Sequence, residues 1–121
     1  MTVTWRIPRC CPTINDWNGP KPWKYAKLAK EWRHEFPPAS RLKAKGKRMV
    51  LIIRVYKRGV GQRRYDLDNL RGGVKVIVDA LKKLGWLVND SPKWCDLVVD
   101  QRHPLAGEWT PCTIVTVSDL A

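Results

Sequence analysis

The chain has 121 residues, the size of one domain, and 44% of them are apolar, which is enough for a hydrophobic core and excludes a disordered chain. It carries 23 Lys and Arg against 11 Asp and Glu, a net charge of +12 at pH 7. No apolar run approaches the ~20 residues of a membrane span, and the N-terminus has no apolar signal segment, so we expect a cytoplasmic protein with no membrane partner.

The positive charge is concentrated in the middle of the chain. Residues 36–65 carry ten basic and no acidic side chains, whereas residues 66–121 carry six basic and eight acidic ones. A domain this basic is expected to bind a polyanion, and nucleic acid is the first candidate. A basic protein with a merely solvated surface is the alternative interpretation.

The first half of the chain predicts a strand, a helix and a strand. Apolar residues alternate over residues 2–7, which is typical of a short strand. A loop rich in Pro and Asn over residues 8–22 leads to an amphipathic helix over residues 23–36, which a Pro-Pro pair ends. Residues 49–57 are rich in β-branched side chains and predict a central strand.

The second half predicts a helix and two strands. Apolar residues at helical spacing predict a helix over residues 69–84, with lysines in its last turn and Gly85 as its stop. Two further strands are expected over residues 94–101 and 112–118. The order β, α, β, α, β, β favours a single α+β domain in which two helices pack on one mixed sheet.

The four cysteines predict no metal site. They are Cys10, Cys11, Cys95 and Cys112. None forms a C-x-x-C pair, and together with His34 and His103 they match no known zinc-ligand spacing. We therefore expect reduced, mostly buried thiols, as in a cytosol-like compartment.

The segment RRYDLDNL, residues 63–70, holds the densest group of chemically active side chains. Asp66 and Asp68 are two apart, so in an extended segment both carboxylates point to the same side. Helix capping explains one such residue, because Asp and Asn are favoured N-caps. The alternative is a Mg²⁺ site, since this ion takes one or two carboxylates with waters and substrate phosphate. Asp90, in a turn after the second helix, offers a third carboxylate.

Carboxylates beside so basic a segment favour one kind of chemistry. In a protein that only binds nucleic acid they would repel phosphate. With a divalent cation between carboxylate and phosphate, they instead suit metal-dependent phosphodiester cleavage, in which the metal polarises the phosphate and activates water.

Several segments together resemble one known family. In chain order they are Ile7-Pro8, Pro12, Asn15, the basic stretch ahead of Asp66, the run DLDNL at 66–70, a helix with a lysine, Asp79-Ala80-Leu81, Gly85 and Asn89-Asp90. This pattern resembles the RusA family of Holliday junction resolvases. The resemblance covers essentially the whole chain and is most specific over residues 63–91.

The resemblance implies a homodimeric, Mg²⁺-dependent endonuclease that nicks four-way DNA junctions by paired symmetric cuts. It also implies a bacterial or phage-encoded protein without a small-molecule organic cofactor. The three metal-site carboxylates map onto Asp66, Asp68 and Asp90. The basic residues expected to contact DNA are Lys57, Arg58, Arg63, Arg64 and Arg71.

The chain departs from the family pattern at three positions. Gly72 stands where the bacterial prototype has a catalytic lysine, and Lys75, with Arg71 as a substitute, is expected to take that role. Asn89 replaces a supporting acid, and Tyr65 replaces an arginine whose role the preceding arginines would cover. A non-catalytic DNA-binding module of the same fold is therefore the alternative function.

Overall fold

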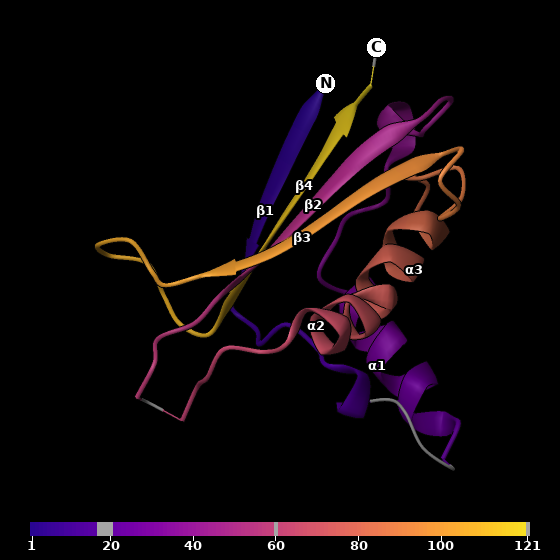
Figure 1. The fold of residues 1–121 in the computed structure, drawn as a ribbon. Helices are drawn as coiled ribbons and strands as arrows, with labels where there is room; N and C mark the ends of the chain where they lie inside the picture. The colour runs from indigo at the N-terminus through magenta and orange to yellow at the C-terminus, as the bar shows by residue number, and fades with distance from the viewer. Residues whose placement is uncertain (17–20, 60, 121) are drawn as a thin grey trace.

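The computed structural model describes residues 1–16, 21–59 and 61–120 and contains one four-stranded mixed sheet (Figure 1). The strands are β1 (Thr2–Ile7), β2 (Arg48–Val55), β3 (Cys95–Arg102) and β4 (Cys112–Asp119). Their order is β1-β4-β2-β3, with β2 and β3 parallel and the other pairs antiparallel. The predicted α+β class and the central place of the second strand are confirmed.

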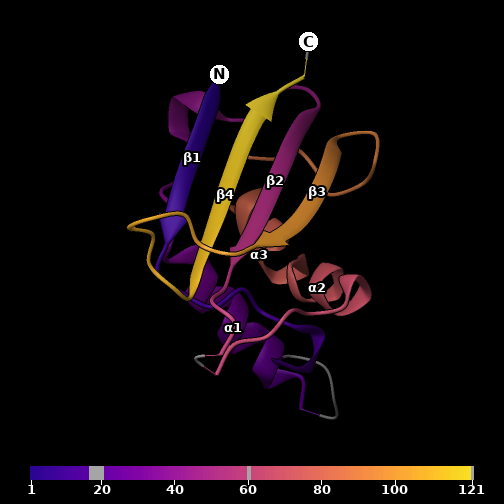
Figure 2. The ribbon, with the colours of Figure 1, turned by 60° about the vertical axis from the view of Figure 1, so that its left-hand side comes forward.

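The helices α1 (Trp23–Arg33), α2 (Leu67–Gly73) and α3 (Lys75–Lys83) cover one face of the sheet, and the other face is left open (Figures 1 and 2). Alternate residues of the strands fill the core on the helix face, among them Val50, Ile52 and Val115. Their partners from the helices include Leu70 and Ile77. This one-sided burial follows from the side-chain period of two in strands. None of the helices in the described part of the chain is long and apolar enough to cross a membrane.

The expected single helix over 69–84 is present as two consecutive helices that meet at Val74. The N-terminal loop packs tightly against this break. A Cβ added at Gly73 would lie 1.9 Å from the Pro12 carbonyl oxygen, so only glycine fits there. This contact allows the N-terminal loop to pack closely on α2. We call α2 and α3 together the helical unit.

The predicted stop at Gly85 is confirmed. Gly85 has a φ of +91°, in the region that favours glycine. The Trp86 N–H donates to the Leu81 carbonyl at 2.9 Å, and the Gly85 N–H donates to the Lys82 carbonyl at 3.1 Å. These two bonds form the Schellman motif that ends α3 and turns the chain towards β3.

Candidate metal and nucleic-acid site

The candidate site lies where β2 ends and the chain crosses to α2, at the end of the sheet remote from both termini (Figure 1). The side chains expected to contact DNA are all exposed there: Lys57, Arg58, Arg63, Arg64 and Arg71. None of the five forms an ion pair with any carboxylate in the described residues. Unpaired, exposed cations are available to neutralise phosphate.

The two aspartates of the DLDNL run stand at the beginning of α2 rather than in an extended segment. Asp66 is the N-cap, and one of its oxygens accepts from the Asn69 N–H at 2.8 Å. Asp68 already lies in the first helical turn. The expectation of two carboxylates spaced along an extended chain is therefore wrong, because a capping residue two positions earlier begins the helix.

Helix capping uses only one of the four carboxylate oxygens of Asp66 and Asp68. Asp66 and Asp68 are both exposed. Within the described residues, the second oxygen of Asp66 and both oxygens of Asp68 take no hydrogen bond or ion pair. Free carboxylate oxygens are the ligands that Mg²⁺ takes, usually from one or two side chains, so the pair fits that ion.

Asp90 lies at the other end of the helical unit. It follows the end of α3, where its carboxylate stands 4.0 Å from the Lys82 ammonium. Asp79 is nearby: burial, and then the charge of Asp90, raise the pKa of Asp79 above its ordinary value, while Lys82 lowers it. The helices α2 and α3 lie between Asp68 and Asp90 along the chain.

Over residues 1–16, 21–59 and 61–120, no three His, Cys, Asp or Glu side chains are grouped so as to hold a metal ion. Asp66 and Asp68 thus form a pair without a third ligand from the same described chain.

Lys75 begins α3, and its amine is directed towards α1. Its Nζ lies 5.7 Å from the ring centroid of Tyr25, whose hydroxyl donates to the Asp79 carboxylate. Arg71, by contrast, lies three residues after Asp68, which places both on one face of α2. Of the two residues considered for the lysine role, Arg71 stands on the same helix face as the carboxylate.

Two side chains, Gln101 and Arg54, hold the start of the site to the sheet, and sequence reasoning found neither of them. The Gln101 side chain accepts from the Tyr65 N–H at 3.0 Å and donates to the Tyr65 carbonyl at 2.6 Å. The same Gln101 oxygen accepts from Arg54 Nη1 at 3.2 Å. The sequence could have indicated Arg54, because it is a charged residue within the apolar strand MVLIIRVYK, residues 49–57.

No protein-family model matches this chain, and no curated protein matches it either. The resemblance to the RusA family therefore stays a prediction based on the motifs.

Proposed function

We propose that this protein is a Mg²⁺-dependent endodeoxyribonuclease that resolves four-way DNA junctions, as the RusA-like motifs predict. The observation that carries the proposal is the free carboxylate pair, Asp66 and Asp68, beside five exposed and unpaired cations. Capping of α2 accounts for Asp66, but in a protein that only held DNA both acids would repel phosphate. With a divalent cation between them and the phosphate, the same acids become attractive.

The residues of the chain divide the work as follows. Asp66 and Asp68 would hold Mg²⁺, which supplies Lewis-acid polarisation of the phosphate and a metal-activated water when it is bound. Arg63 and Arg64 bind the backbone on the loop side. Arg71, on the same helix face as Asp68, adds positive charge near the cleaved phosphate.

The place of Asp90 supports the homodimer that the resemblance implies. A two-fold axis perpendicular to a helix reverses its direction, so the beginning of one helical unit would meet the end of its copy. A second copy related in this way would bring its Asp90 towards Asp66 and Asp68 of the first. Two such sites on one axis match the two-fold symmetry of an open four-way junction, which the paired nicks require.

The first experiment is a nicking assay with Mg²⁺ on a four-way junction and on a linear duplex of the same arm sequences. We expect paired nicks on the junction and little cleavage of the duplex. Asp68→Asn should lower the rate about a hundredfold or more, because the loss of a metal ligand removes several kcal/mol of transition-state stabilisation. Binding of Asp68→Asn in EDTA should be unchanged or tighter.

Asp96→Asn is the matched control, because Asp96 is also an exposed aspartate and is held by Lys47 at 3.0 Å, at the start of β3. Its nicking rate should equal that of the wild type. Tight junction binding with no nicking under any Mg²⁺ concentration would reject the nuclease and assign the non-catalytic DNA-binding module instead.

A mixing experiment tests the origin of the third carboxylate. Asp68→Asn and Asp90→Asn chains are each expected to be inactive alone. In a mixed dimer with exchanged ends, one of the two sites keeps all three aspartates, so nicking of one strand should return. If each site belongs to one chain, every mixed dimer stays inactive, and the exchange is rejected.

A further inference from the structure

A cavity of about 370 Å³ lies between the end of β2, the loop before α2 and the N-terminal loop, and we call it the Arg54 pocket. Arg54, Arg63, Tyr65, Asn69 and Cys10 are among the residues that line it. At ~30 Å³ for each water in the liquid, it has room for about ten waters. A pocket of this size admits a ligand group much larger than a single water.

Arg54 brings a buried charge to this pocket. Its residue surface is only 2% exposed, and its Nε is buried without a hydrogen-bond acceptor among the described residues. Its Cζ lies over the ring of Tyr65, 3.5 Å from the centroid, and Nη1 donates to Gln101. No carboxylate of the described residues lies within ion-pair distance of Arg54. The guanidinium is thus held in place by neutral groups alone.

A buried guanidinium without a counterion is unfavourable, because burial removes its hydration and nothing replaces the lost charge interaction. Water in the pocket would satisfy the free N–H but not the charge. Arg63 adds a second cation to the lining, and no acid among the described residues lines the pocket. The pocket therefore suits an anion with several acceptor oxygens, and arginine pairs well with phosphate oxygens.

The pocket adjoins the carboxylate pair. Asn69 lines the pocket, its N–H donates to Asp66, and its side-chain oxygen accepts from the Ile14 N–H at 3.1 Å. Asp66 follows Tyr65, another lining residue. We propose that the Arg54 pocket binds a phosphate group and that the DNA backbone supplies it, from a nucleotide next to the phosphate that faces Asp66 and Asp68. The DNA source rests on the proposed function, whereas the anion site rests on the pocket alone.

Cys10 offers a readout that does not depend on catalysis. It lines the pocket with its Sγ 3.6 Å from the Tyr65 hydroxyl, and it is the exposed one among the four cysteines. Burial raises the pKa of the neighbouring Cys11 to about 12, so Cys11 stays an unreactive thiol. Alkylation by iodoacetamide, followed by peptide mass spectrometry, therefore reports on access to the pocket.

The experiment measures the alkylation rate of Cys10 in the full-length protein with inorganic phosphate, at an ionic strength held constant with NaCl. At ten times the dissociation constant, phosphate should slow alkylation about tenfold, because it occupies about nine-tenths of the pockets. Junction DNA in EDTA should also slow it. Phosphate should weaken junction binding more than chloride does at equal ionic strength.

Arg54→Gln should remove the protection by phosphate, and Arg54→Lys should keep part of it. Arg41→Gln is the matched control: it deletes an exposed arginine of the short helical turn Ser40–Leu42, outside the pocket lining, and should leave protection intact. If Arg54→Gln does not fold, Arg63→Gln, at an exposed lining residue, should weaken the protection instead.

Each outcome has one meaning. If neither phosphate nor DNA slows alkylation of the wild type, the anion site is rejected. If phosphate protects but does not compete with the junction, the DNA source is rejected and a free anion remains. A protein that nicks junctions without protection of Cys10 disproves only the pocket, and a protected protein that never nicks disproves only the nuclease.

Discussion

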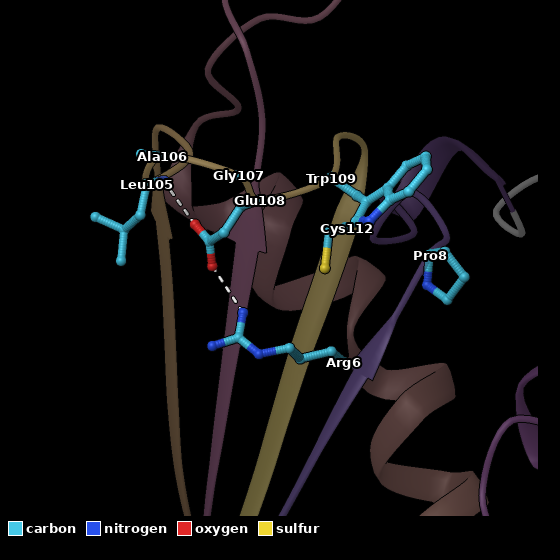
Figure 3. Close-up of a pocket in the computed structure, with 8 residues that line it drawn as sticks. All are labelled: Arg6, Pro8, Leu105, Ala106, Gly107, Glu108, Trp109 and Cys112. Carbon is cyan, nitrogen blue, oxygen red and sulfur yellow. Dashed lines mark hydrogen bonds and ion pairs between the residues drawn. The ribbon is translucent and has the colours of Figure 1, made fainter.

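Two groups of arginines lie at the same end of the sheet, on its opposite faces. Gln101 and Arg102 are neighbours on β3, so their side chains point to opposite faces. On the helix face, Arg54 meets Gln101 and no acid of the described chain. On the open face, Arg102 and Arg6 share one acid, Glu108. Figure 3 shows the bond between Glu108 and Arg6.

Both arginines of the open-face group pair with one acid of the chain. Glu108 accepts from Arg102 at 2.5 and 2.9 Å, from Arg6 at 2.7 Å and from the Leu105 N–H at 2.7 Å. The bidentate bond from Arg102, then the Leu105 N–H and Arg6, hold the pKa of Glu108 well below its usual range. A wider cavity of about 720 Å³ lies beside this group, between Trp109 and Leu105 (Figure 3). Both carboxylate oxygens of Glu108, which also lines this cavity, already accept hydrogen bonds from within the chain.

The difference between the two faces separates charges that the fold pairs from charges that it leaves unpaired among the described residues. Where arginines hold the loop between β3 and β4, the chain provides their counterion. Where Arg54 and the exposed arginines of residues 57–71 stand, the described chain provides none, although its free acids, Asp66 and Asp68, are close in sequence. An arginine that finds its acid within the fold is part of the scaffold, and one that does not is available to a ligand.

The largest expected effect is on the stability of the fold next to Arg54, where the N-terminal loop packs on α2. Gly73→Ala should destabilise the protein by about 3 kcal/mol, because the new Cβ meets the Pro12 carbonyl and backbone must move. Gly72→Ala is the control in the same helix: its Cβ would lie 3.1 Å from the flexible end of Ile14, and alanine favours the helix by about 1 kcal/mol. Urea denaturation followed by circular dichroism measures both. Equal stabilities would show that the N-terminal loop does not press on α2.

A smaller effect is expected on the salt dependence of DNA binding. Replacing Arg63 and Arg64 by Ala should flatten the slope of log affinity against log salt by about two, since each phosphate contact contributes about 0.9. That corresponds to about tenfold less loss of affinity between 50 and 200 mM salt. Arg6→Ala should change the slope less, because Arg6 is already paired with Glu108 within the fold. Fluorescence anisotropy with a labelled junction, at several salt concentrations, measures both slopes. Equal slopes for the two variants would contradict the expectation that only the helix-face arginines contact phosphate.

The smallest effect is a pH dependence on the open face. The folded-state pKa of Glu108 lies below its ordinary value of 4.5, so the carboxylate stabilises the fold above that pH and loses its contribution as acid protonates it. Glu108→Gln should therefore lower the thermal midpoint by a few degrees at pH 7. The difference from the wild type should shrink steadily below pH 4.5. A constant difference across that range would mean that the ion pairs with Arg6 and Arg102 do not stabilise the loop.

The sequence by itself determined the order of the elements, the basic segment before α2 and the stop at Gly85. These depend on local causes: periodicity, helix capping, and the backbone freedom of glycine. It also marked Asp66 and Asp68 as candidates for a helix cap or a metal site, because capping and metal binding draw on the same residue types, but it placed both in an extended segment, whereas Asp68 lies in the first turn of α2. Local rules did not distinguish helix capping from metal binding. Asp66 caps α2 with one oxygen, and the other carboxylate oxygens of the pair take no partner within the described residues.

The tertiary structure alone decided which charges meet. Sheet register brings Arg54 to Gln101, and the loop after β3 brings Glu108 back to Arg6, across 47 and 102 positions of sequence. Packing of α1 on α3 turns Lys75 towards Tyr25, and within the described residues the fold groups no third possible metal ligand with Asp66 and Asp68. Long side chains pair according to what the fold places within a few ångströms of them, and no spacing along the chain encodes that distance.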